Sequence, residues 1–507
     1  MNLPMNLPMN LIEPFLHQVA RRPAQLAVVT PRVGVSFGEL ARHSAQLARE
    51  LGRRGVGPGQ RLLVLQPLGV ELYAVLIALW RLGAVAVLPA AVPWSCWRQT
   101  LVPLGLTAVV GDWRARLATA AVPALGALPH WGASPGGRGG GLVGESWVDL
   151  DPAAPALITF TSGSTGLPKA IVRSHGFLSH QHRQVTAAMA PEPGAVELTA
   201  LAVFVLANLA NGVTSVLPAG LSRGPDALGP ASLGRQVGRH RATRLVLPPA
   251  SLARWVAAPP PGGEGIERVF TGGGPVFPDL LARLEDQWPG EVTVLYGSSE
   301  AEPIAHIATA QLGDADWRAM AQGRGLLVGA PVAEVGLRLV DDEIQVSGPG
   351  VVQGYGDPRR DRETKVVAGG VVWHRTGDAG RLDGAGRLWL LGRHSARVAG
   401  YYPFAVEAVA RQLPGVAQAA LVGDAQGRGW VVLQPEGGVT PRGRRAIVHS
   451  LGARFPVLGV RWLRRLPMDR RHRSKVDYPR LRKRLCGPFS GNPWAFVQGA
   501  CSFPRQV

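Results

Sequence analysis

Lysine is almost absent from this chain. Only four of its 507 residues are lysine, so nearly all of the basic residues behind the formal charge of +19 are arginine. The arginines are scattered, apart from one dense run between 461 and 484 that also contains apolar residues. This run predicts a solvated basic face and no nucleic-acid partner, because a binding arm concentrates its charge without such interruptions. The four lysines are Lys169, Lys365, Lys475 and Lys483.

Cysteine is also rare, and its pattern excludes two kinds of stabilisation. Cys96, Cys486 and Cys501 are odd in number and far apart, so neither a disulfide framework nor a cysteine metal cluster is expected. The most apolar run, 72–88, is interrupted by Arg81 and does not predict a membrane span. The N-terminus lacks the basic start and apolar core of a secretory signal. We therefore expect a cytoplasmic protein without integral membrane association.

Length and hydrophobic content predict more than one domain. A chain of 507 residues, 46% of them hydrophobic, is too long for one ordinary core. From 10 to 150, and again from 155 to 331, helix-like segments alternate with short apolar strands, which predicts parallel α/β layers. Glycines multiply between 332 and 391 and predict a β-rich subdomain, whereas the glycine- and proline-rich stretch 123–144 is expected to be a surface loop.

The expected fold class is α/β, with a large N-terminal domain followed by a small α+β domain. The large domain is expected at 1–392, the small one at 393–486, and a tail without periodicity at 487–507. Strands are expected at 61–65, 84–88, 108–110, 156–161, 244–247, 268–271 and 293–296, and helices at 41–51 and 72–82.

Residues 159–169, TFTSGSTGLPK, are the most informative segment. They combine five hydroxyl side chains, two glycines and a proline with Lys169. Successive amide groups in such a loop form a concave anion site, and a lysine at its end adds a point charge, a combination that suits a polyphosphate. The pattern GxxxxGK[ST] is absent, so this is not a Walker loop. The alternative is an ordinary surface loop rich in glycine and serine.

Four further motifs follow in order. TGGGP (271–275) ends one predicted strand and lets the backbone lie flat against a planar ligand. LYGSSE (295–300) ends another strand and supplies an aromatic ring, hydroxyls and a carboxylate. HRTGD (374–378) precedes GRLWLLGR (386–393), and RSKVD (473–477) lies near the end of the C-terminal unit. Each motif alone has an ordinary structural explanation, but five in this order indicate one function.

On these residues the chain resembles the AMP-forming acyl-adenylate synthetase superfamily, which contains acyl-CoA synthetases, peptide-synthetase adenylation domains and firefly luciferase. The resemblance extends over roughly 12–485. It implies a large N-terminal domain of stacked α/β subdomains and a small mobile C-terminal domain. It also implies that ATP and Mg²⁺ serve to form an acyl-adenylate with release of pyrophosphate, and that the acyl group then passes to a second nucleophile, with CoA as the expected co-substrate.

The resemblance implies a role for each motif. The phosphate loop would cradle the β- and γ-phosphates beside Lys169, through Thr161, Ser162, Gly163, Ser164, Thr165 and Gly166. Glu300 would hold Mg²⁺, which prefers oxygen ligands, and Ser299 would lie near the α-phosphate. Asp378 would accept both ribose hydroxyls. The remaining nucleotide contacts would come from Tyr296 stacked on adenine, from Arg393, and from the backbone at Gly272, Gly273, Gly274 and Gly297.

Lys475 would enter the site for adenylation and bridge the substrate carboxylate and the α-phosphate as charge builds there. Together with Lys169 and Glu300 it forms the candidate catalytic set. After adenylation the C-terminal domain would swing away, as in other multi-step enzymes.

Several residues depart from the pattern of the superfamily. Ala170 replaces the glycine that usually follows the loop lysine, and Ser474 replaces the glycine before Lys475. Ser395 occupies the hinge position, where Asp or Lys is common. Val205 stands where a histidine or aromatic residue often gates the reacting carboxylate, which would suit a long aliphatic chain.

The second nucleophile is left open by the sequence. The leading hypothesis is activation of a medium- or long-chain fatty acid followed by transfer to CoA. Short segments such as 204–209 and 373–378 are also similar to the β-lactone synthetases of bacterial long-chain olefin synthesis, in which a 3-hydroxy acid supplies its own hydroxyl and CoA is not needed. The third alternative is a nucleotide-binding relative with little catalysis; the retained charged residues Lys169, Glu300, Asp378 and Lys475 argue against it.

Overall fold

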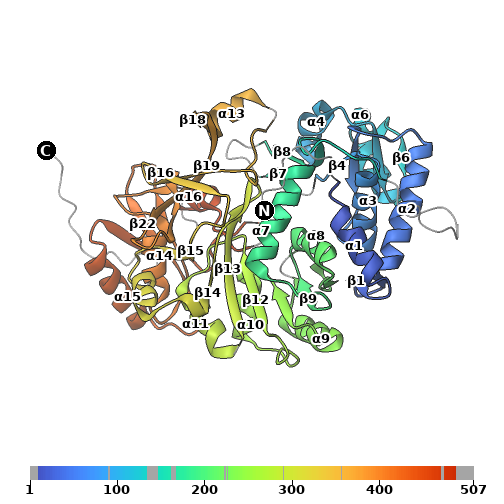
Figure 1. Cartoon of the computed structure of the whole chain (residues 1–507). Helices are drawn as coiled ribbons and strands as arrows, with labels where there is room; N and C mark the ends of the chain where they lie inside the picture. The colour runs from blue at the N-terminus through green and yellow to red at the C-terminus, as the bar shows by residue number, and fades with distance from the viewer. Residues whose placement is uncertain are drawn as a thin grey trace.

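The structure is a computed structural model that describes residues 10–89, 92–133, 147–161, 167–221, 224, 227–288, 290–355, 357–469 and 473–486. Within these ranges the chain forms four sheets that pack with helices, and one of them joins strands of 26–36 to strands of 196–308. Figure 1 shows the first sheet, with its blue and cyan helices, at one side of the molecule and the orange and red C-terminal elements at the other. No helix within these ranges has the length and apolar composition needed to cross a bilayer.

The first layer is a six-stranded sheet in the order β6-β5-β3-β4-β7-β8, parallel except for the β7–β8 pair. Its two faces carry different helices: α2 (Phe37–Arg53) and α3 (Val70–Arg81) cover one, and α4 (Trp97–Thr100), α5 (Trp113–Ala120) and α6 (Pro123–Gly126) cover the other. Because α3 is apolar on nearly every side, it is buried almost completely. The strands are β3 (Arg61–Leu65), β4 (Val85–Val87), β5 (Ala108–Gly111), β6 (His130–Trp131), β7 (Pro155–Thr161) and β8 (Lys169–Ser174).

The second layer is an eight-stranded sheet in the order β14-β13-β12-β11-β9-β10-β1-β2. Its central strands are parallel and almost completely buried, as expected for strands that are covered on both faces. The strands are β1 (Leu26–Val29), β2 (Gly34–Ser36), β9 (Val196–Thr199), β10 (Thr214–Val216), β11 (Arg244–Val246), β12 (Arg268–Gly272), β13 (Glu291–Ser298) and β14 (Ala301–Ala308). The helices of this part of the chain are α1 (Glu13–Arg21), α7 (His175–Met189), α8 (Ala202–Asn211), α9 (Pro230–His240), α10 (Pro249–Ala257) and α11 (Pro278–Gln287).

The third sheet is built from antiparallel pairs in the order β15-β20-β19-β17-β16, with β18 paired to β19. The strands are β15 (Leu326–Gly329), β16 (Gly336–Val340), β17 (Glu343–Ser347), β18 (Lys365–Ala368), β19 (Val371–Leu382) and β20 (Leu388–Arg393). Two helices belong to this region, α12 (Asp314–Ala321) before the sheet and α13 (Pro358–Thr364) before β18.

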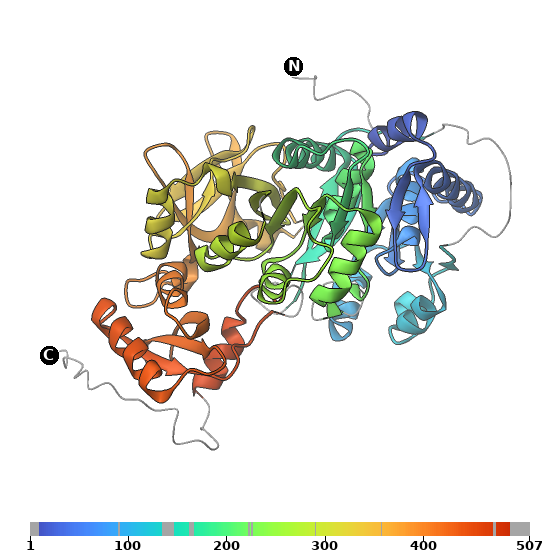
Figure 2. The ribbon, with the colours of Figure 1, turned by 90° about the horizontal axis from the view of Figure 1, so that it is seen from below.

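The C-terminal unit is a three-stranded sheet with three helices and hydrophobic clusters of its own. Figure 2 shows this unit, coloured orange to red, at one corner of the molecule. The elements are α14 (Pro403–Arg411), β21 (Val416–Gly423), β22 (Gly429–Pro435), α15 (Pro441–Arg454), β23 (Leu458–Trp462) and α16 (Tyr478–Cys486). It joins the body through Arg411, whose guanidinium makes two hydrogen bonds of 3.0 and 2.7 Å to the carboxylate of Asp279 on α11.

The predicted α/β class and the predicted strands are confirmed, including the β-rich character of 332–391. The expectation of a loop over 123–144 is wrong where the structure describes it: α6 and β6 lie there, because Leu125 is buried in the core under α5. The domain limits at 392 and 486 stay predictions.

Candidate active site

The phosphate-loop motif connects two antiparallel strands, with Thr161 at the end of β7 paired to Lys169 at the start of β8. Ser162, Gly163, Ser164, Thr165 and Gly166 lie outside the described residues. Antiparallel pairing brings Lys169 back beside the residue where the loop begins. The Nζ atom of Lys169 lies 5.6 Å from the centroid of the Tyr355 ring.

Tyr355 connects this hairpin to Glu300. Its hydroxyl donates a hydrogen bond of 2.8 Å to Oε1 of Glu300, which lies in the turn between β13 and β14. Burial disfavours the charge of Glu300, but His374 and the hydrogen bond from Tyr355 outweigh burial and hold the pKa of this carboxyl below its ordinary value. Glu300 is therefore ionised at physiological pH. A group of three or more metal-ligating side chains is not found within the described ranges.

Lys365 and His374 complete the surroundings of Glu300. Nζ of Lys365 lies 5.5 Å from the centroid of the Tyr355 ring and donates to the carbonyl oxygen of Val352. Burial lowers the pKa of Lys365 to about 8, against the opposing effect of Glu300. Burial and the charge of Lys365 lower the pKa of His374 to about 4, so this imidazole is neutral at physiological pH.

A second cluster joins β13, β19 and β20. The hydroxyl of Tyr296 donates a hydrogen bond of 3.0 Å to Oδ2 of Asp378, and a guanidinium nitrogen of Arg393 lies 3.3 Å from Oδ1. Asp378 and Arg393 are cross-strand partners, so sheet register fixes this pair. The charges of Asp378 and Glu300 raise the pKa of Arg393, which places both clusters within one electrostatic environment.

The glycine motif after β12 lies between these clusters and the C-terminal unit. Gly272 pairs with Leu295, and a Cβ atom at Gly272 would lie 2.5 Å from the Leu295 carbonyl oxygen. A Cβ atom at Gly274 would lie 2.6 Å from Cβ of Ser474, so the turn that carries Lys475 rests on this glycine. The hydroxyl of Ser474 also accepts a 3.2 Å hydrogen bond from the amide of Ala250.

Lys475 lies on a turn whose backbone is bound by Asp469. Its amide donates to Oδ1 of Asp469 at 2.9 Å, and its carbonyl accepts from the Asp469 amide at 2.8 Å. Val476 forms a bridge with Met468, and α16 begins two residues later at Tyr478. The turn thus presents Ser474 to the body and leaves the Lys475 side chain largely exposed.

The remaining predicted residues fall in the same region. Ser299 follows β13, and its carbonyl oxygen accepts a 2.8 Å hydrogen bond from the guanidinium of Arg173 on β8. Gly297 lies in the bulge of β13, where a Cβ atom would approach the Ala301 carbonyl oxygen to 2.9 Å. The structure therefore brings all described members of the predicted site to one region; their roles stay predictions.

An apolar cluster lies beside the glycine motif. It contains Phe204 of α8, Met189 of α7 and Phe270 of β12, with Leu295 of β13 packed against them. Val205, at the position where a polar gate is common, is fully buried in the neighbouring core. The side chains of this cluster and of Val205 are thus aliphatic and aromatic.

Sequence reasoning missed Tyr355, Lys365 and Arg173. Lys365 could have been singled out by the rarity of lysine, but nothing local predicts its neighbours. It reaches Glu300 because β18 pairs with β19 and places Lys365 opposite His374.

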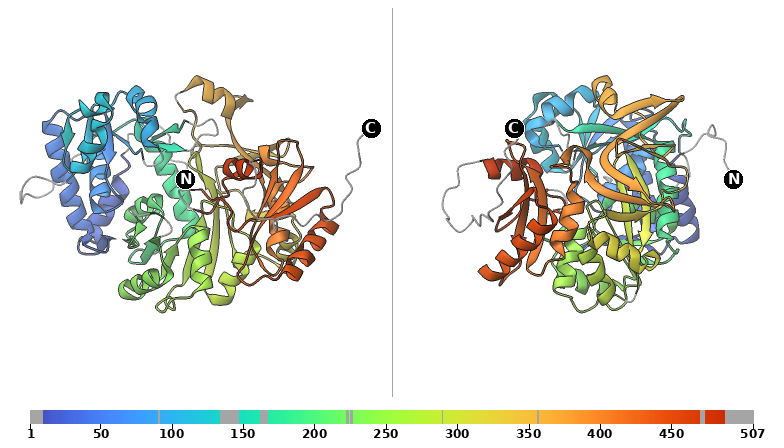
Figure 3. Two further views of the ribbon diagram at one scale, coloured as in Figure 1. Left: turned by 180° about the vertical axis from the view of Figure 1, so that it is seen from behind. Right: turned by 90° about the vertical axis from the view of Figure 1, so that its left-hand side faces the viewer.

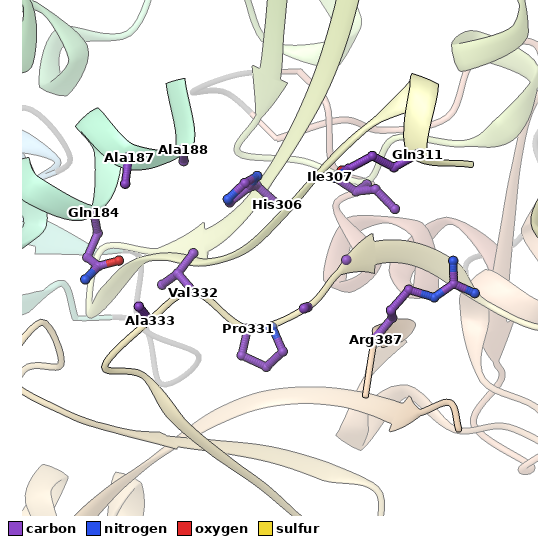
Figure 4. A pocket seen from close by; sticks show the side chains of 12 residues that line it. Gln184, Ala187, Ala188, His306, Ile307, Gln311, Pro331, Val332, Ala333 and Arg387 are labelled. Carbon is purple, nitrogen blue, oxygen red and sulfur yellow. The ribbon is translucent and has the colours of Figure 1, made fainter. Parts of the chain in front are cut away.

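A groove of about 360 Å³ lies elsewhere, between α7, β14 and the segment after β15 (Figure 4). Its lining includes Gln184, His306, Pro331 and Arg387, and none of the predicted site residues. Arg387 is already bound by Asp316 and Asp383. The groove is separate from the candidate active site.

Known proteins resemble the chain over most of its length. An olefin β-lactone synthetase of Stenotrophomonas maltophilia is 29% identical over 94% of this chain and 98% of its own. An indoleacetate–CoA ligase of Aromatoleum aromaticum is 29% identical over 79% and 82%. The amide bond synthetase McbA of Marinactinospora thermotolerans shares the fold with a TM-score of 0.76, at 23% identity over 92% and 99% of the two chains.

The family described as AMP-binding enzyme matches residues 15–91 and 110–356. The match contains the phosphate-loop hairpin, the glycine motif after β12 and the turn that carries Glu300. With these segments gathered at one site, the resemblance seen in the motifs is confirmed: the chain belongs to the family of AMP-binding enzymes.

Proposed function

We propose that this enzyme uses ATP to activate an aliphatic carboxylic acid as its acyl-adenylate, with release of pyrophosphate. The proposal rests on one observation: Lys169, Glu300, Asp378 and the turn that carries Lys475 come from four distant segments and converge on one region. Two charged clusters, one around Glu300 and one around Asp378, suit the two ends of a nucleoside triphosphate.

The chemistry requires two anions to meet. A carboxylate oxygen of the acid attacks the α-phosphorus, a new P–O bond forms, and the bond to the bridging oxygen of the β-phosphate breaks. Lys169 offsets charge on the departing phosphates, and Lys475 offsets charge on the carboxylate and the α-phosphate. Mg²⁺ held by Glu300 and phosphate oxygens would neutralise further charge there.

At the other end of the nucleotide, Asp378 accepts the ribose hydroxyls. Tyr296 and Arg393 already hold the carboxylate of Asp378, so its position is fixed before the nucleotide arrives. Such preorganisation reduces the entropy lost when the ribose binds.

For the second step we favour the hydroxyl of the substrate itself as the acceptor. A 3-hydroxyl oxygen would attack the acyl carbon, close a four-membered lactone ring, expel AMP and lose its proton to solvent. Two olefin β-lactone synthetases align with 94% and 92% of this chain, and the apolar cluster around Phe204 suits a long hydrocarbon chain.

The second candidate acceptor is the thiol of CoA. The similarity to an indoleacetate–CoA ligase over 79% of the chain favours it. In that reaction the thiolate sulfur attacks the same acyl carbon, and AMP again leaves.

The test separates the two steps. Purified enzyme is incubated with ATP, Mg²⁺ and either fatty acids or 3-hydroxy fatty acids, with and without CoA, and pyrophosphate, AMP and acyl products are measured. We expect acid-dependent pyrophosphate release, and a lactone from the 3-hydroxy acid without CoA. A product that forms only with CoA supports the second candidate. No pyrophosphate release across the whole series would show that adenylation is not the function.

A further inference from the structure

The most exposed large hydrophobic side chains among the described residues lie at one end of the molecule. Val367 is 71% exposed, Trp113 65%, Leu117 64% and Trp94 60%. Trp94 precedes α4, Trp113 and Leu117 lie on α5 beside α6, and Val367 lies on β18. Figure 1 shows these elements along the upper edge of the view, with α4 and α6 beside the first sheet and α13 and β18 above the third, and the left view of Figure 3 shows the same arrangement from behind.

Sheet topology explains why the two tryptophans share this end. β3, β4, β5 and β7 are parallel, so their carboxyl ends meet at one edge of the sheet. Trp94 follows the carboxyl end of β4, and Trp113 follows that of β5 by two residues. The phosphate-loop connection leaves the carboxyl end of β7 at the same edge.

Core packing does not account for these side chains. Trp97 and Ala115 point inward and are buried in the cluster under α4 and α5. Trp113 and Leu117 are one helical turn apart on α5 and point away from this cluster. The ring of Trp94 stacks on Trp97 at 5.3 Å but remains mostly in solvent.

Arginines surround the exposed apolar groups. Over 92–133 the charged side chains are Arg98, Arg114 and Arg116, all exposed, and a single acid, Asp112. Asp112 is occupied as the N-cap of α5 and lies 3.8 Å from Arg114. α13 adds the exposed Arg359 and Arg362, together with the exposed acid Glu363.

We propose that this end of the molecule, defined by Trp94, Trp113, Leu117 and Val367 with Arg98, Arg114 and Arg116, binds the surface of an anionic lipid bilayer. Tryptophan is enriched at the boundary between headgroups and acyl chains, and each arginine near an anionic surface contributes about 1 kcal/mol. Because the apolar side chains stand on separate elements with arginines between them, they suit insertion between lipids better than packing against one protein face. The net charge of +19 favours the same partner.

The test measures cosedimentation with lipid vesicles, and it is independent of the proposed enzymatic activity. Vesicles of phosphatidylcholine alone are compared with vesicles that also contain phosphatidylglycerol. The protein is expected to bind the second kind, and added salt should weaken the binding. The double variant Arg114→Gln/Arg116→Gln should lower the partition coefficient roughly tenfold or more, since two basic groups are lost. Trp94→Ser/Trp113→Ser should lower it at least as much.

The matched control replaces two exposed apolar residues outside this end, Val340 (41% exposed) and Val457 (50% exposed), by serine, and it should bind like the wild type. All substituted side chains are exposed, so the variants should keep the wild-type circular dichroism spectrum. The proposal is overturned if anionic vesicles do not retain the protein, or if the tryptophan variant binds as well as the control. If the protein self-associates but does not bind vesicles, and the tryptophan variant no longer self-associates, the proposal is also overturned. This end of the molecule would then be a protein interface.

Discussion

The body and the C-terminal unit hold their parts of the candidate site in different ways. In the body, charged side chains are fixed by other side chains: Asp378 by Tyr296 and Arg393, and Glu300 by Tyr355. In the C-terminal unit, the backbone of Lys475 is bound by the amide and the carboxylate of Asp469, and Ser474 lies against Gly274. In the proposed function the body would therefore supply a preformed nucleotide site, and the C-terminal unit would supply Lys475.

The largest effect is expected from Lys475→Ala. If the lysine acts only on charge that builds during adenylation, its loss should lower acyl-AMP formation by about 10²–10³-fold while ATP affinity is nearly unchanged. Pyrophosphate exchange and calorimetric ATP titration measure the two quantities. Lys483→Ala, on the exposed side of α16, is the control. If Lys475→Ala lost ATP affinity to the same extent as acyl-AMP formation, the body and the C-terminal unit would not have separate roles in binding and adenylation.

The body and the C-terminal unit also differ in the groups that bind a buried carboxylate. Glu197 in the body is paired with Arg244 at 3.3 Å and accepts from Asn208, whereas the hydrogen bonds to Glu407 in the C-terminal unit come from the Leu421 amide and the Tyr478 hydroxyl. Burial raises the pKa of Glu407 to about 7 from its ordinary 4.5, although these bonds and the charge of Arg411 oppose the rise. A raised carboxyl pKa means that the folded state binds the proton more tightly than the unfolded state does.

The stability that Glu407 contributes is therefore fully present below about pH 4.5 and is lost as pH rises through about 7. The loss amounts to about 3 kcal/mol between these limits. Hydrogen exchange of the amides in α14 and β21, at about pH 5 and about pH 8 and corrected for intrinsic rates, measures it. Glu407→Gln should flatten the pH dependence. Parallel profiles for wild type and variant would show that Glu407 does not titrate in this range.

Asp378→Ala should affect the quantity that Lys475→Ala leaves nearly unchanged, which is ATP affinity. Loss of a charged acceptor for the ribose should weaken ATP binding by about 10- to 100-fold. Asp378→Asn, which keeps the shape and one acceptor oxygen, should fall between the two. The same titration measures all three proteins. Unchanged ATP affinity in the alanine variant would show that Asp378 does not hold the ribose.

The sequence predicted local features well and long-range pairing poorly. The motif order predicted that Lys169, Tyr296, Glu300 and Asp378 belong to one site, because each stands in a short motif with a recognisable pattern. Tyr355 has no such signal: it becomes a neighbour of Glu300 only through the packing of the β-rich sheet against β14. Likewise the stretch after 123 is rich in glycine and proline, yet part of it forms a helix because Leu125 is buried in the core.

The docking contact itself gives the smallest and most specific effect. A methyl group at Gly274 would lie 2.6 Å from Cβ of Ser474, so Gly274→Ala should push the turn outward without touching Glu300 or Asp378. We expect adenylation to fall about tenfold, as for other overpacked contacts, with ATP affinity unchanged. Ser474→Gly removes the opposing Cβ atom, so the double variant Gly274→Ala/Ser474→Gly should recover much of the lost rate. Rescue would show that docking of the turn, and not the flexibility of the glycine loop, limits the delivery of Lys475. If the double variant is as slow as Gly274→Ala alone, the defect lies in the body. The inference that this contact delivers Lys475 from the C-terminal unit would then be wrong.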